Sequence, residues 1–271
     1  MTDRASRHVR DLFSLEGRRF LVVGGARNLG FDMAEALAEA GADGVVTSRE
    51  AAAAEAAAAR LAAATGRAIT GLGIDATDEG QVASGVAAAI DRLGHLDVVV
   101  ACVGGGGTKA PPALEERPVA AWDAIQRANV TAPFLVCKHV APHLRSRRSG
   151  SIITVASIAG IVGRDRSVYV DGMAPQTLDY AAAKAAVLGF TRDLAAYLGP
   201  HGIRVNAISP GGFERGQPPG FVAAYARKCP LGRMGRDGVD LKGAAVFLAS
   251  DASAYVTGHN LVVDGGFTTW Q

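Results

Sequence analysis

The segment FLVVGGARNLG, residues 20–30, passes from a short apolar run through a glycine-rich turn toward a helix. Residues 20–23 are apolar throughout, which is typical of a strand buried on both faces of a parallel sheet. Residues 30–40 have the composition of a helix, because alanine, leucine and glutamate all favour it. A strand, a glycine turn and a helix in this order predict the first unit of an α/β fold.

Apolar runs and helical segments continue to alternate beyond this unit. The predicted strands are residues 45–47, 69–74, 96–100, 152–155, 203–208 and 261–263. The predicted helices are residues 50–64, 79–93, 119–144, 178–198 and 239–248, and Pro142 is expected to bend or end its helix. Residues 210–220, rich in proline and glycine, are predicted to form a loop. Strict alternation implies a parallel sheet with helices on both faces.

No linker, composition break or repeat divides the 271 residues, and a single α/β domain of this size is routine. We therefore expect one doubly wound, Rossmann-type α/β domain of about seven strands over residues 15–271. Residues 1–14 are expected to form an N-terminal extension. A ligand of such a domain is expected at the carboxyl ends of the strands.

Composition excludes several classes of protein. The 28 basic and 26 acidic residues leave a net charge of +2, which argues against nucleic acid as the main partner. The three cysteines are scattered and lack metal-site spacing, so we expect neither disulfides nor zinc, and a reducing, cytoplasmic environment. Residues 1–20 lack the apolar core of a signal peptide, and no apolar run approaches the length of a membrane span.

The turn after the first strand is a candidate phosphate-binding site. Glycines let a backbone approach a pyrophosphate, and a helix N-terminus offers free N–H groups to it. The spacing is GxxxNxG instead of GxGxxG, and Asn28 tolerates the positive φ that a glycine would otherwise supply. The candidate cofactor-binding residues here are Gly24, Arg27, Asn28, Leu29 and Gly30. The same turn would also serve as a plain connection between a strand and a helix.

The end of the second strand distinguishes between the two nicotinamide cofactors. NAD sites place an acidic residue there to bind the ribose 2′-hydroxyl, whereas this chain has Ser48 and Arg49. Together with Arg27 these groups suit a 2′-phosphate, so we predict NADP, with NAD the less favoured cofactor. The alternative is that both arginines merely lie on the surface. Asp75 and Ala76 follow the third strand and are candidates for contacting the adenine.

Tyr180 and Lys184 lie four residues apart at the start of a predicted helix, and therefore on one helix face. A phenol has a pKa of about 10, and a nearby ammonium group lowers it. Tyr180 is therefore a candidate acid/base for a substrate alcohol or ketone, with Lys184 tuning its pKa. Ser157, at the end of the preceding strand, could bond the substrate oxygen as charge develops on it. A YxxxK pattern alone is common and is often structural.

In combination these motifs resemble the compact short-chain dehydrogenases/reductases, over about residues 15–266. The matching motifs, in family order, are the glycine turn, Asp75, Leu96-Asp97-Val98-Val99, Asn129, Ser157, Tyr180, Lys184, Arg204-Val205-Asn206-Ala207, Pro210-Gly211 and Val263-Asp264-Gly265-Gly266. The resemblance implies reversible hydride transfer between a nicotinamide and a carbonyl or alcohol. It implies that Lys184 also holds the nicotinamide ribose and that Asn129 sustains a water-linked proton path to Lys184. It also implies a homotetramer packed partly through residues 119–144 and 178–198.

Several residues depart from the family pattern. Ala101-Cys102-Val103-Gly104 replaces the family's NNAG, and Val23 stands where a threonine is usual. Phe213-Glu214-Arg215 follow Pro210-Gly211, where the family has a threonine. By position in the family pattern, Gly104, Pro210, Gly211 and Phe213 remain candidates for binding the cofactor. The catalytic candidates are all present, so we expect an active enzyme.

Ser157 and Tyr180 are 23 positions apart, longer than the family's usual interval. The extra residues, 164–176, start and end near catalytic candidates, so they must lie near the mouth of the active site. This insertion is polar, as is the stretch 214–217, and we hypothesise a sugar, sugar acid or polyol held by Arg164, Arg166 or Arg215. The alternative is a solvated loop that contacts a neighbouring subunit.

The expected function is NADP-dependent interconversion of a secondary alcohol and a ketone. A 3-ketoacyl-thioester reductase is the main alternative within this reaction class. A non-catalytic nucleotide sensor is the alternative outside it, although such a protein would normally have lost the Tyr or the Lys retained here. An epimerase or dehydratase of the larger branch would carry a longer C-terminal domain, whereas this chain ends seven residues after Asp264.

Two further patterns are weak. His139 and His143 have the i, i+4 spacing of a metal pair, but no glutamate accompanies them and we expect no metal. Residues 104–109 resemble a phosphate loop without its GK[ST] order. We expect them to provide flexible backbone beside the nicotinamide.

Overall fold

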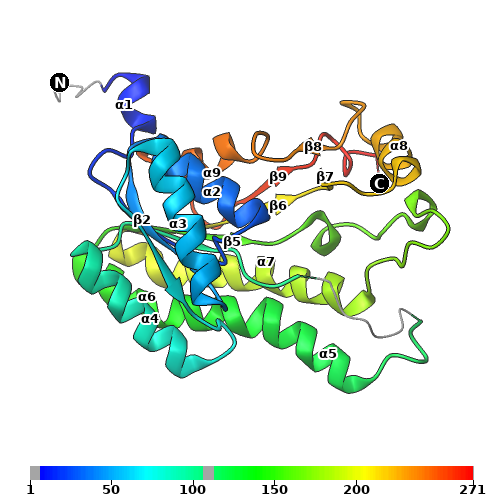
Figure 1. Cartoon of the computed structure of the whole chain (residues 1–271), viewed down its shortest axis with the longest axis horizontal. Helices are drawn as coiled ribbons and strands as arrows, with labels where there is room; N and C mark the ends of the chain where they lie inside the picture. Colours follow the sequence, from blue (N-terminus) through cyan, green and yellow to red (C-terminus); the bar gives the residue numbers. More distant parts are fainter. Residues whose placement is uncertain (1–6, 106–112, 271) are drawn as a thin grey trace.

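The computed structural model describes residues 7–105 and 113–270 and contains a seven-stranded sheet (Figure 1). The strands lie in the order β3-β2-β1-β4-β5-β6-β9, and every neighbouring pair is parallel. Their bounds are β1 Arg19–Val23, β2 Asp43–Ser48, β3 Ile69–Gly73, β4 Val98–Ala101, β5 Gly150–Val155, β6 Ile203–Pro210 and β9 Asn260–Val263. The chain winds outward from β1 in one direction and from β4 in the other. This order confirms the predicted doubly wound, Rossmann-type sheet.

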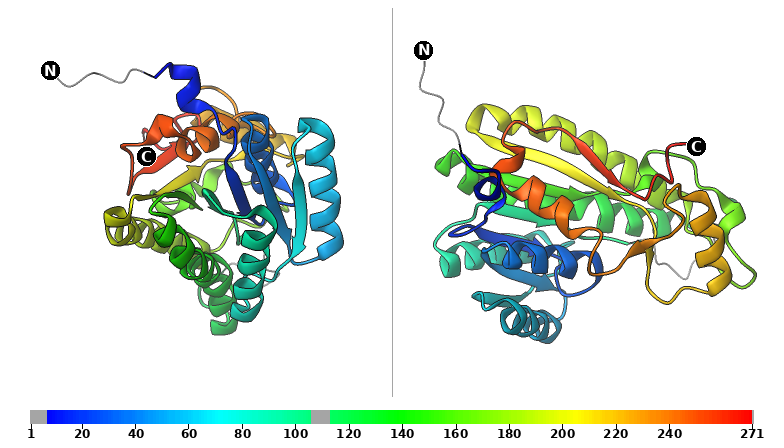
Figure 2. Two further views of the ribbon diagram at one scale, coloured as in Figure 1. Left: turned by 90° about the vertical axis from the view of Figure 1, so that its left-hand side faces the viewer. Right: turned by 90° about the horizontal axis from the view of Figure 1, so that it is seen from above.

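Helices cover both faces of the sheet (Figure 2). One face carries α2 (Asn28–Glu39), α3 (Ala51–Thr65) and α9 (Lys242–Ala249), whose apolar side chains pack with Phe20 and Val22 of β1. The other face carries α4 (Glu79–Leu93), α6 (Ala132–Arg147) and α7 (Leu178–Leu198), which pack with Leu21 and Val23. Alternate side chains of β1 therefore point to opposite faces and are buried on both. This double burial is why its sequence is a continuous apolar run.

The segment predicted as one helix over residues 119–144 is divided. α5 (Val119–Gln126) passes through a π-helical turn, Arg127–Thr131, into α6, which ends at Arg147. Pro142 lies inside α6, so the prediction that it might end the helix is wrong. Val140 and Leu144 on either side of Pro142 are fully buried, and their packing offsets the hydrogen bond that the proline removes. The π turn carries Asn129 and holds that side chain in the protein interior.

α8 (Pro219–Lys228) was not predicted, and its first two residues lie in the segment predicted to form a loop. Phe221 and Tyr225 lie four residues apart on one face of α8 and are buried in an apolar cluster of their own. Two short strands, β7 (Phe213–Glu214) and β8 (Gly235–Arg236), form a separate two-stranded sheet that was also not predicted. α9 begins at Lys242, slightly later than expected.

Residues 7–14 contact the end of α9 and the turn that follows it. They include the short helix α1 (Val9–Phe13), and the Phe13 ring lies 6.4 Å from the Phe247 ring, centroid to centroid. Arg7 forms an ion pair with Asp251 at 2.7 Å. Within the two described ranges, no helix is both long and apolar enough to cross a bilayer.

Candidate active site

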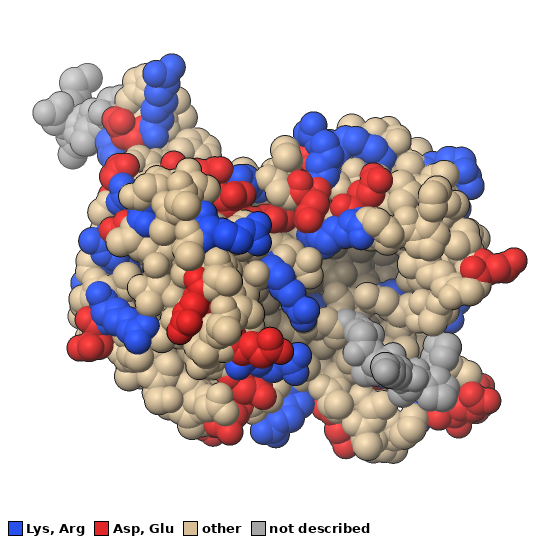
Figure 3. Space-filling model, in the orientation of Figure 1, with Lys and Arg blue, Asp and Glu red and all other residues tan. Residues whose placement is uncertain are grey.

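A cleft of about 670 Å³ lies at the carboxyl ends of β1, β2, β4 and β5, and Figure 3 shows a hollow in this face with basic side chains at its edge. β1 and β4 are the neighbours from which the sheet winds in opposite directions, which is where doubly wound sheets bind ligands. Most predicted site residues line the cleft: Gly24, Arg27, Asn28, Leu29, Gly30, Ser48, Arg49, Asp75, Ala76, Gly104, Ser157, Tyr180, Lys184, Pro210 and Gly211. Asn129 and Phe213 are not among the lining residues.

The glycine turn is shaped for the close approach of a ligand. Gly24 has a φ of 83°, and a Cβ at this position would lie 2.2 Å from the carbonyl oxygen of Cys102. Asn28 has a φ of 51°, the conformation expected of the residue that replaces a glycine here. α2 begins at Asn28 without a side-chain cap, so the N–H groups of its first turn are available to an anion.

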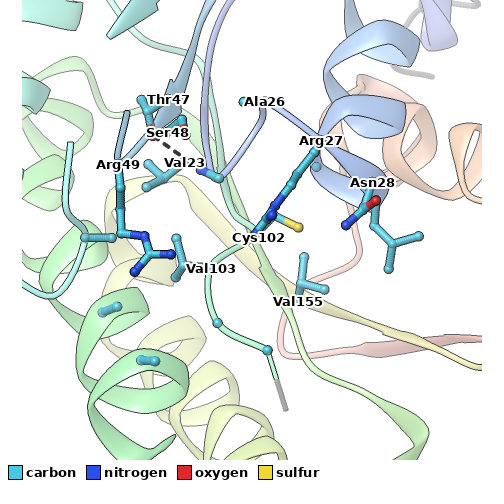
Figure 4. Close-up of a pocket in the computed structure, with 18 of the residues that line it drawn as sticks. Val23, Ala26, Arg27, Asn28, Thr47, Ser48, Arg49, Cys102, Val103 and Val155 are labelled. Carbon is cyan, nitrogen blue, oxygen red and sulfur yellow. Dashed lines mark hydrogen bonds between the residues drawn. The ribbon is translucent and has the colours of Figure 1, made fainter. Parts of the chain in front are cut away.

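Arg27 and Arg49 reach into the cleft from the glycine turn and from the end of β2 (Figure 4). Neither guanidinium forms an ion pair with any part of the chain that the structure describes. Thr47, which the sequence analysis missed, accepts a hydrogen bond from the Gly24 N–H at 3.3 Å and ties the turn to β2. Hydrogen bonds from the backbone and hydroxyl of Thr77 lower the pKa of Asp75, so this carboxylate is ionised at the edge of the cleft.

Ser157, Tyr180 and Lys184 line the same cleft. Ser157 follows β5, and a short 3-10 turn, Ile158–Gly160, brings this segment against α7. Gly160 permits the contact, because a Cβ there would lie 2.6 Å from the carbonyl carbon of Lys184. The Lys184 ammonium donates to the carbonyl oxygen of Val155 at 2.8 Å and lies 5.6 Å from the centre of the Tyr180 ring.

Burial dominates the electrostatics of this group. It raises the pKa of Tyr180 above the usual value, while the Ser157 hydroxyl and the Arg164 guanidinium act in the opposite direction. Burial also lowers the pKa of Lys184 from 10.5 to about 8. The pKa of Tyr180 is therefore raised and not lowered, because burial outweighs the opposing effects of Ser157 and Arg164.

The first turn of α7 is anchored by a buried carboxylate that the sequence analysis did not single out. Asp179 accepts hydrogen bonds from the Tyr180 N–H at 2.9 Å, from the Thr177 hydroxyl, and from Arg117 Nε at 2.6 Å. The Arg117 and Asp179 side chains are 6% and 0% exposed, so this ion pair is almost dry. Gln126 of α5 donates to the carbonyl oxygen of Asp179 at 3.1 Å. The backbone that carries Tyr180 is therefore fixed from several directions.

Asn129 lies behind the cleft and is fully buried. Its side-chain amide donates to the carbonyl oxygens of Gly105 and Ile125, both at 3.0 Å, and its oxygen accepts from the Gly105 N–H at 3.0 Å. These bonds join the π turn to the backbone that follows β4. Residues 106–109 of the predicted glycine-rich backbone beside the nicotinamide lie outside the described residues.

Proteins of known activity match almost the whole chain. A family model described as "Enoyl-(Acyl carrier protein) reductase" matches residues 24–268. Gluconate 5-dehydrogenase of Gluconobacter oxydans is 36% identical over 264 residues, covering 95% of this chain and 97% of that protein. This chain belongs to the short-chain dehydrogenase/reductase family.

Two further proteins are similar to this dehydrogenase/reductase, one in sequence and one in solved structure. Cis-4-hydroxycyclohexanecarboxylate dehydrogenase of Sinomonas cyclohexanicum is 38% identical over 252 residues, covering 92% of this chain and 95% of that protein. The crystal structure of a gluconate 5-dehydrogenase from Burkholderia cenocepacia, in complex with NADP and tartrate, superposes with a TM-score of 0.86 at 33% identity, covering 97% of this chain and 99% of that one. The protein is therefore an oxidoreductase of the NAD(P)-binding type that acts on CH–OH groups.

The loop after β6 departs from what the sequence predicted for this dehydrogenase/reductase. Phe213 is 4% exposed in β7 and packs into the apolar core, so its side chain does not line the cleft. Arg215 does line the cleft, but its guanidinium is held by Asp237 at 2.5 Å and faces Asp32 at 3.8 Å. Burial raises the pKa of Asp32. The hydroxyl of Tyr225 accepts a hydrogen bond from the Gly212 N–H at 2.6 Å and so supports the turn after Pro210.

The insertion at residues 164–176 is only partly polar, which corrects the prediction from its sequence. Val168 is buried, and Tyr169, Val170 and Met173 pack with Phe221 and Tyr225 of α8 and their neighbours. The Tyr169 and Phe221 rings lie 5.5 Å apart, centroid to centroid. Asp165 forms an ion pair with Lys228 at 2.8 Å, and this contact with the Ser167 hydrogen bonds lowers its pKa to about 2. The insertion is therefore anchored to α8, a helix that was itself missed.

The two histidines with metal-pair spacing have other partners. His139 lies 3.3 Å from a carboxylate oxygen of Glu79, and the ring of His143 accepts a hydrogen bond from the Leu96 N–H at 3.0 Å. Across residues 7–105 and 113–270, His, Cys, Asp and Glu side chains form no cluster that could hold a metal ion.

Proposed function

We propose that this chain is an NADP-dependent oxidoreductase that interconverts a secondary alcohol and a ketone on a polar sugar, sugar acid or polyol. The observation that carries the proposal is the arrangement of the cleft. Ser157, Tyr180 and Lys184 line the cleft, and Arg27 and Arg49 reach into it from the glycine turn and from the end of β2. The first group is equipped for proton transfer and the second for binding a phosphate.

Tyr180 is the acid/base in this proposal. In the direction of ketone reduction its hydroxyl donates a proton to the carbonyl oxygen of the substrate, and in the reverse direction the phenolate takes the proton from the alcohol. The high pKa that burial gives Tyr180 keeps it protonated and ready to donate. The Ser157 hydroxyl bonds the same substrate oxygen and stabilises the charge that develops on it. A bound nicotinamide supplies or accepts the hydride.

Lys184 and Asn129 support the proton transfer. The Lys184 ammonium is buried beside the phenol and holds the ribose of the cofactor. Its pKa of about 8 lets it exchange a proton close to neutral pH. Asn129 sustains a water-linked path to Lys184, a role consistent with its buried place in the π turn.

The residues of the cleft fit an NADP molecule. The positive-φ turn from Gly24 to Gly30 and the uncapped start of α2 accommodate the pyrophosphate. Arg27, Ser48 and Arg49 bind the 2′-phosphate, and no acidic residue stands at the end of β2 to select NAD. Asp75 and Ala76 contact the adenine, while Gly104, Pro210 and Gly211 adjoin the nicotinamide. The NADP complex of the Burkholderia cenocepacia relative supports this choice of cofactor.

The proposed substrate class rests on the substrates for which the relatives are named. Gluconate and hydroxycyclohexanecarboxylate are polar molecules with a secondary alcohol, and the dehydrogenases named for them match nearly the whole chain. Reduction of a 3-ketoacyl thioester is the second candidate, favoured by the description of the matching family model as an acyl-carrier-protein reductase. A nucleotide sensor is disfavoured because Ser157, Tyr180 and Lys184 are all retained.

A panel of substrates tests this proposal. We expect the purified protein to reduce 5-keto-D-gluconate or a related ketone faster than a 3-ketoacyl thioester, with kcat/KM higher for NADPH than for NADH. The measurement is the absorbance of the reduced nicotinamide. A kcat/KM for NADH equal to or higher than that for NADPH would contradict the assignment of NADP as the cofactor. Turnover of the thioester but of no sugar-derived ketone would contradict the proposed substrate class and favour the thioester reductase.

The proposed assembly is a homotetramer in the cytoplasm. Large apolar side chains are exposed along α5, α6 and α7, including Trp122, Phe134 and Tyr197, and these would be covered by self-association. The free thiols of Cys102, Cys137 and Cys229 suit a reducing compartment. A mass in solution close to four times the 27.8 kDa of one chain would support the tetramer.

A further inference from the structure

Arg215 is the charged side chain that the loop after β6 brings to the cleft. It directly follows β7, and its backbone N–H donates to the side-chain oxygen of Gln217 at 2.6 Å. Gln217 donates in turn to the carbonyl oxygen of Phe213 at 2.8 Å, and the Phe213 side chain packs into the apolar core. The turn that carries Arg215 is therefore closed by its own hydrogen bonds and anchored in the core.

The guanidinium of Arg215 faces α2, the helix that follows the glycine turn. Its Nη2 atom lies 3.8 Å from Oδ2 of Asp32. Asp32 comes four residues after Asn28, the first residue of α2, so the two lie on one face of the helix. Asn28 lines the cleft, as Arg215 does, and no side chain caps this end of α2. Arg215 therefore adds a positive charge beside the helix terminus that is itself suited to an anion.

Two carboxylates share Arg215, and they differ in exposure. Asp237 accepts a hydrogen bond from Nε at 2.7 Å and lies 2.5 Å from Nη2, and its side chain is 42% exposed. The Asp32 side chain is 8% exposed and also accepts a hydrogen bond from the Gly238 N–H at 3.2 Å. A partly exposed ion pair contributes little to stability, because water solvates the separated charges well. The contact with Asp237 can therefore be exchanged at small cost, while Asp32 stays in place.

The guanidinium also keeps N–H donors for a further acceptor. Among the residues that the structure describes, the two carboxylates engage Nε and Nη2 of Arg215 and leave Nη1 to a ligand of the cleft. In the same parts of the chain its ion pairs are with Asp32 and Asp237, and not with the segments that carry Ser157 and Tyr180. This placement favours a phosphate of the cofactor over the substrate as the ligand of Arg215.

We propose that Arg215 is a cofactor-binding residue that exchanges Asp237 for the pyrophosphate of the dinucleotide at the start of α2. The inference rests on the proposed function, because it adds a contact to the same cofactor site. The fork of guanidinium donors matches phosphate oxygens, and Asp32 keeps the guanidinium turned toward α2. NADP and NAD share the pyrophosphate, so Arg215 acts on the affinity for both, whereas Arg27 and Arg49 act at the 2′-phosphate.

The test measures binding and needs no turnover. The variants are Arg215→Gln, Asp237→Asn and the two combined. Arg49→Gln serves as a comparison at the 2′-phosphate. Arg236→Gln is the matched control, because Arg236 is an exposed arginine of the neighbouring β8 that pairs with Asp240. Dissociation constants for NADPH and NADH come from nicotinamide fluorescence, and those for 2′-AMP, which lacks the pyrophosphate, come from calorimetry.

We expect Arg215→Gln to weaken the binding of NADPH and NADH alike, by about tenfold, because a hydrogen bond between two charged groups is lost. Asp237→Asn should strengthen the binding of both by about two- to fivefold, because the competing carboxylate is gone. In the double variant this gain should disappear, since it acts through Arg215. The binding of 2′-AMP should stay unchanged in these three variants, and Arg236→Gln should bind every probe as the parent does.

Several results would overturn the inference. One is an Arg215→Gln variant that binds both dinucleotides as tightly as the parent, or that loses affinity for NADPH alone. Another is an equal loss of affinity for 2′-AMP, which would show that the effect is not confined to the pyrophosphate. Weaker binding by Asp237→Asn, or a gain that persists in the double variant, would show that Asp237 does not compete with the cofactor for Arg215.

Arg49→Gln separates this inference from the proposed function. If the choice of NADP fails, the parent binds NADPH no better than NADH and Arg49→Gln leaves their ratio unchanged, while Arg215→Gln still weakens both. If only the inference fails, Arg49→Gln lowers the preference for NADPH and Arg215→Gln weakens neither dinucleotide.

Discussion

Lys184 is a charged residue that the fold buries almost completely. It is 3% exposed, and its ammonium donates a hydrogen bond to the carbonyl oxygen of Val155. A cation in such a place is costly unless its neighbours compensate for lost water. Burial therefore lowers the pKa of Lys184 to about 8. Burial also raises the pKa of Tyr180, against the smaller opposing effects of Ser157 and Arg164.

The buried ammonium predicts a dependence of stability on pH. A lysine with a pKa of about 8 when folded and 10.5 when unfolded binds fewer protons in the folded state between these values, so stability rises with pH in that window. Relative to Lys184→Met, the free energy of unfolding of the parent should increase by roughly 1–3 kcal/mol between pH 7 and pH 10.5. Urea unfolding without cofactor measures this difference. A difference that stays flat, or falls, would show that Lys184 keeps an ordinary pKa.

At the residue scale the sequence predicted what depends on local chemistry. The positive φ of Asn28 follows from the turn, and the meeting of Tyr180 with Lys184 follows from helical spacing. The contribution of Arg164 to Tyr180 could not be predicted, since it depends on where the insertion packs. The contact of Thr47 with the glycine turn could have been predicted, because Thr47 lies in the predicted second strand beside that turn.

At the scale of elements, the start of α7 depends on a pair of residues far apart in the chain. Arg117 and Asp179 are 62 positions apart and meet only because α5 and α7 pack together. No pattern in the sequence connects them. The sequence feature that could have drawn attention to Asp179 is its position directly before Tyr180. The pair fixes the backbone N–H of Tyr180, and so couples the segment before α5 to the reacting group.

The buried pair predicts a loss of both stability and activity. Asp179→Asn removes the charge that faces the Arg117 guanidinium, and breaking a buried ion pair from one side costs about 3–5 kcal/mol. We also expect a lower kcat, because the first turn of α7 loses an anchor. Asp193→Asn, on the exposed side of the same helix, is the matched control and should change the unfolding free energy little. If the two variants unfold at the same urea concentration, the ion pair does not hold the helix.

Elements with a strong apolar pattern were predicted, and those that depend on a neighbouring element were not. β1, β4 and β5 contain continuous apolar runs, so their existence followed from the sequence. Pro218, Pro219 and Gly220 at the start of α8 indicate a loop, although proline is well suited to a first helical turn and Pro218 lies just before the helix. Its buried face is completed by the insertion, and neither segment shows its packing alone.

At the scale of the whole molecule, the site arises from the topology. The strand order places the ends of β1, β2, β4 and β5 along one edge, and this brings residues between positions 23 and 215 into one cleft. The near-zero net charge conceals this arrangement, since Arg27 and Arg49 both lie at the cleft. The composition argues against nucleic acid as the main partner but says nothing of where the local charge lies.

The central claim is that Tyr180 transfers the proton in an NADP-dependent reaction, and Tyr180→Phe tests it most directly. The variant removes one oxygen and leaves the ring that packs beside Lys184. Turnover of the best ketone, followed by NADPH absorbance, should fall by roughly 10²–10⁴-fold, the usual contribution of general acid–base catalysis. The affinity for NADPH, measured by its fluorescence, should stay close to that of the parent. A variant that retains most of the parent's turnover would contradict the account.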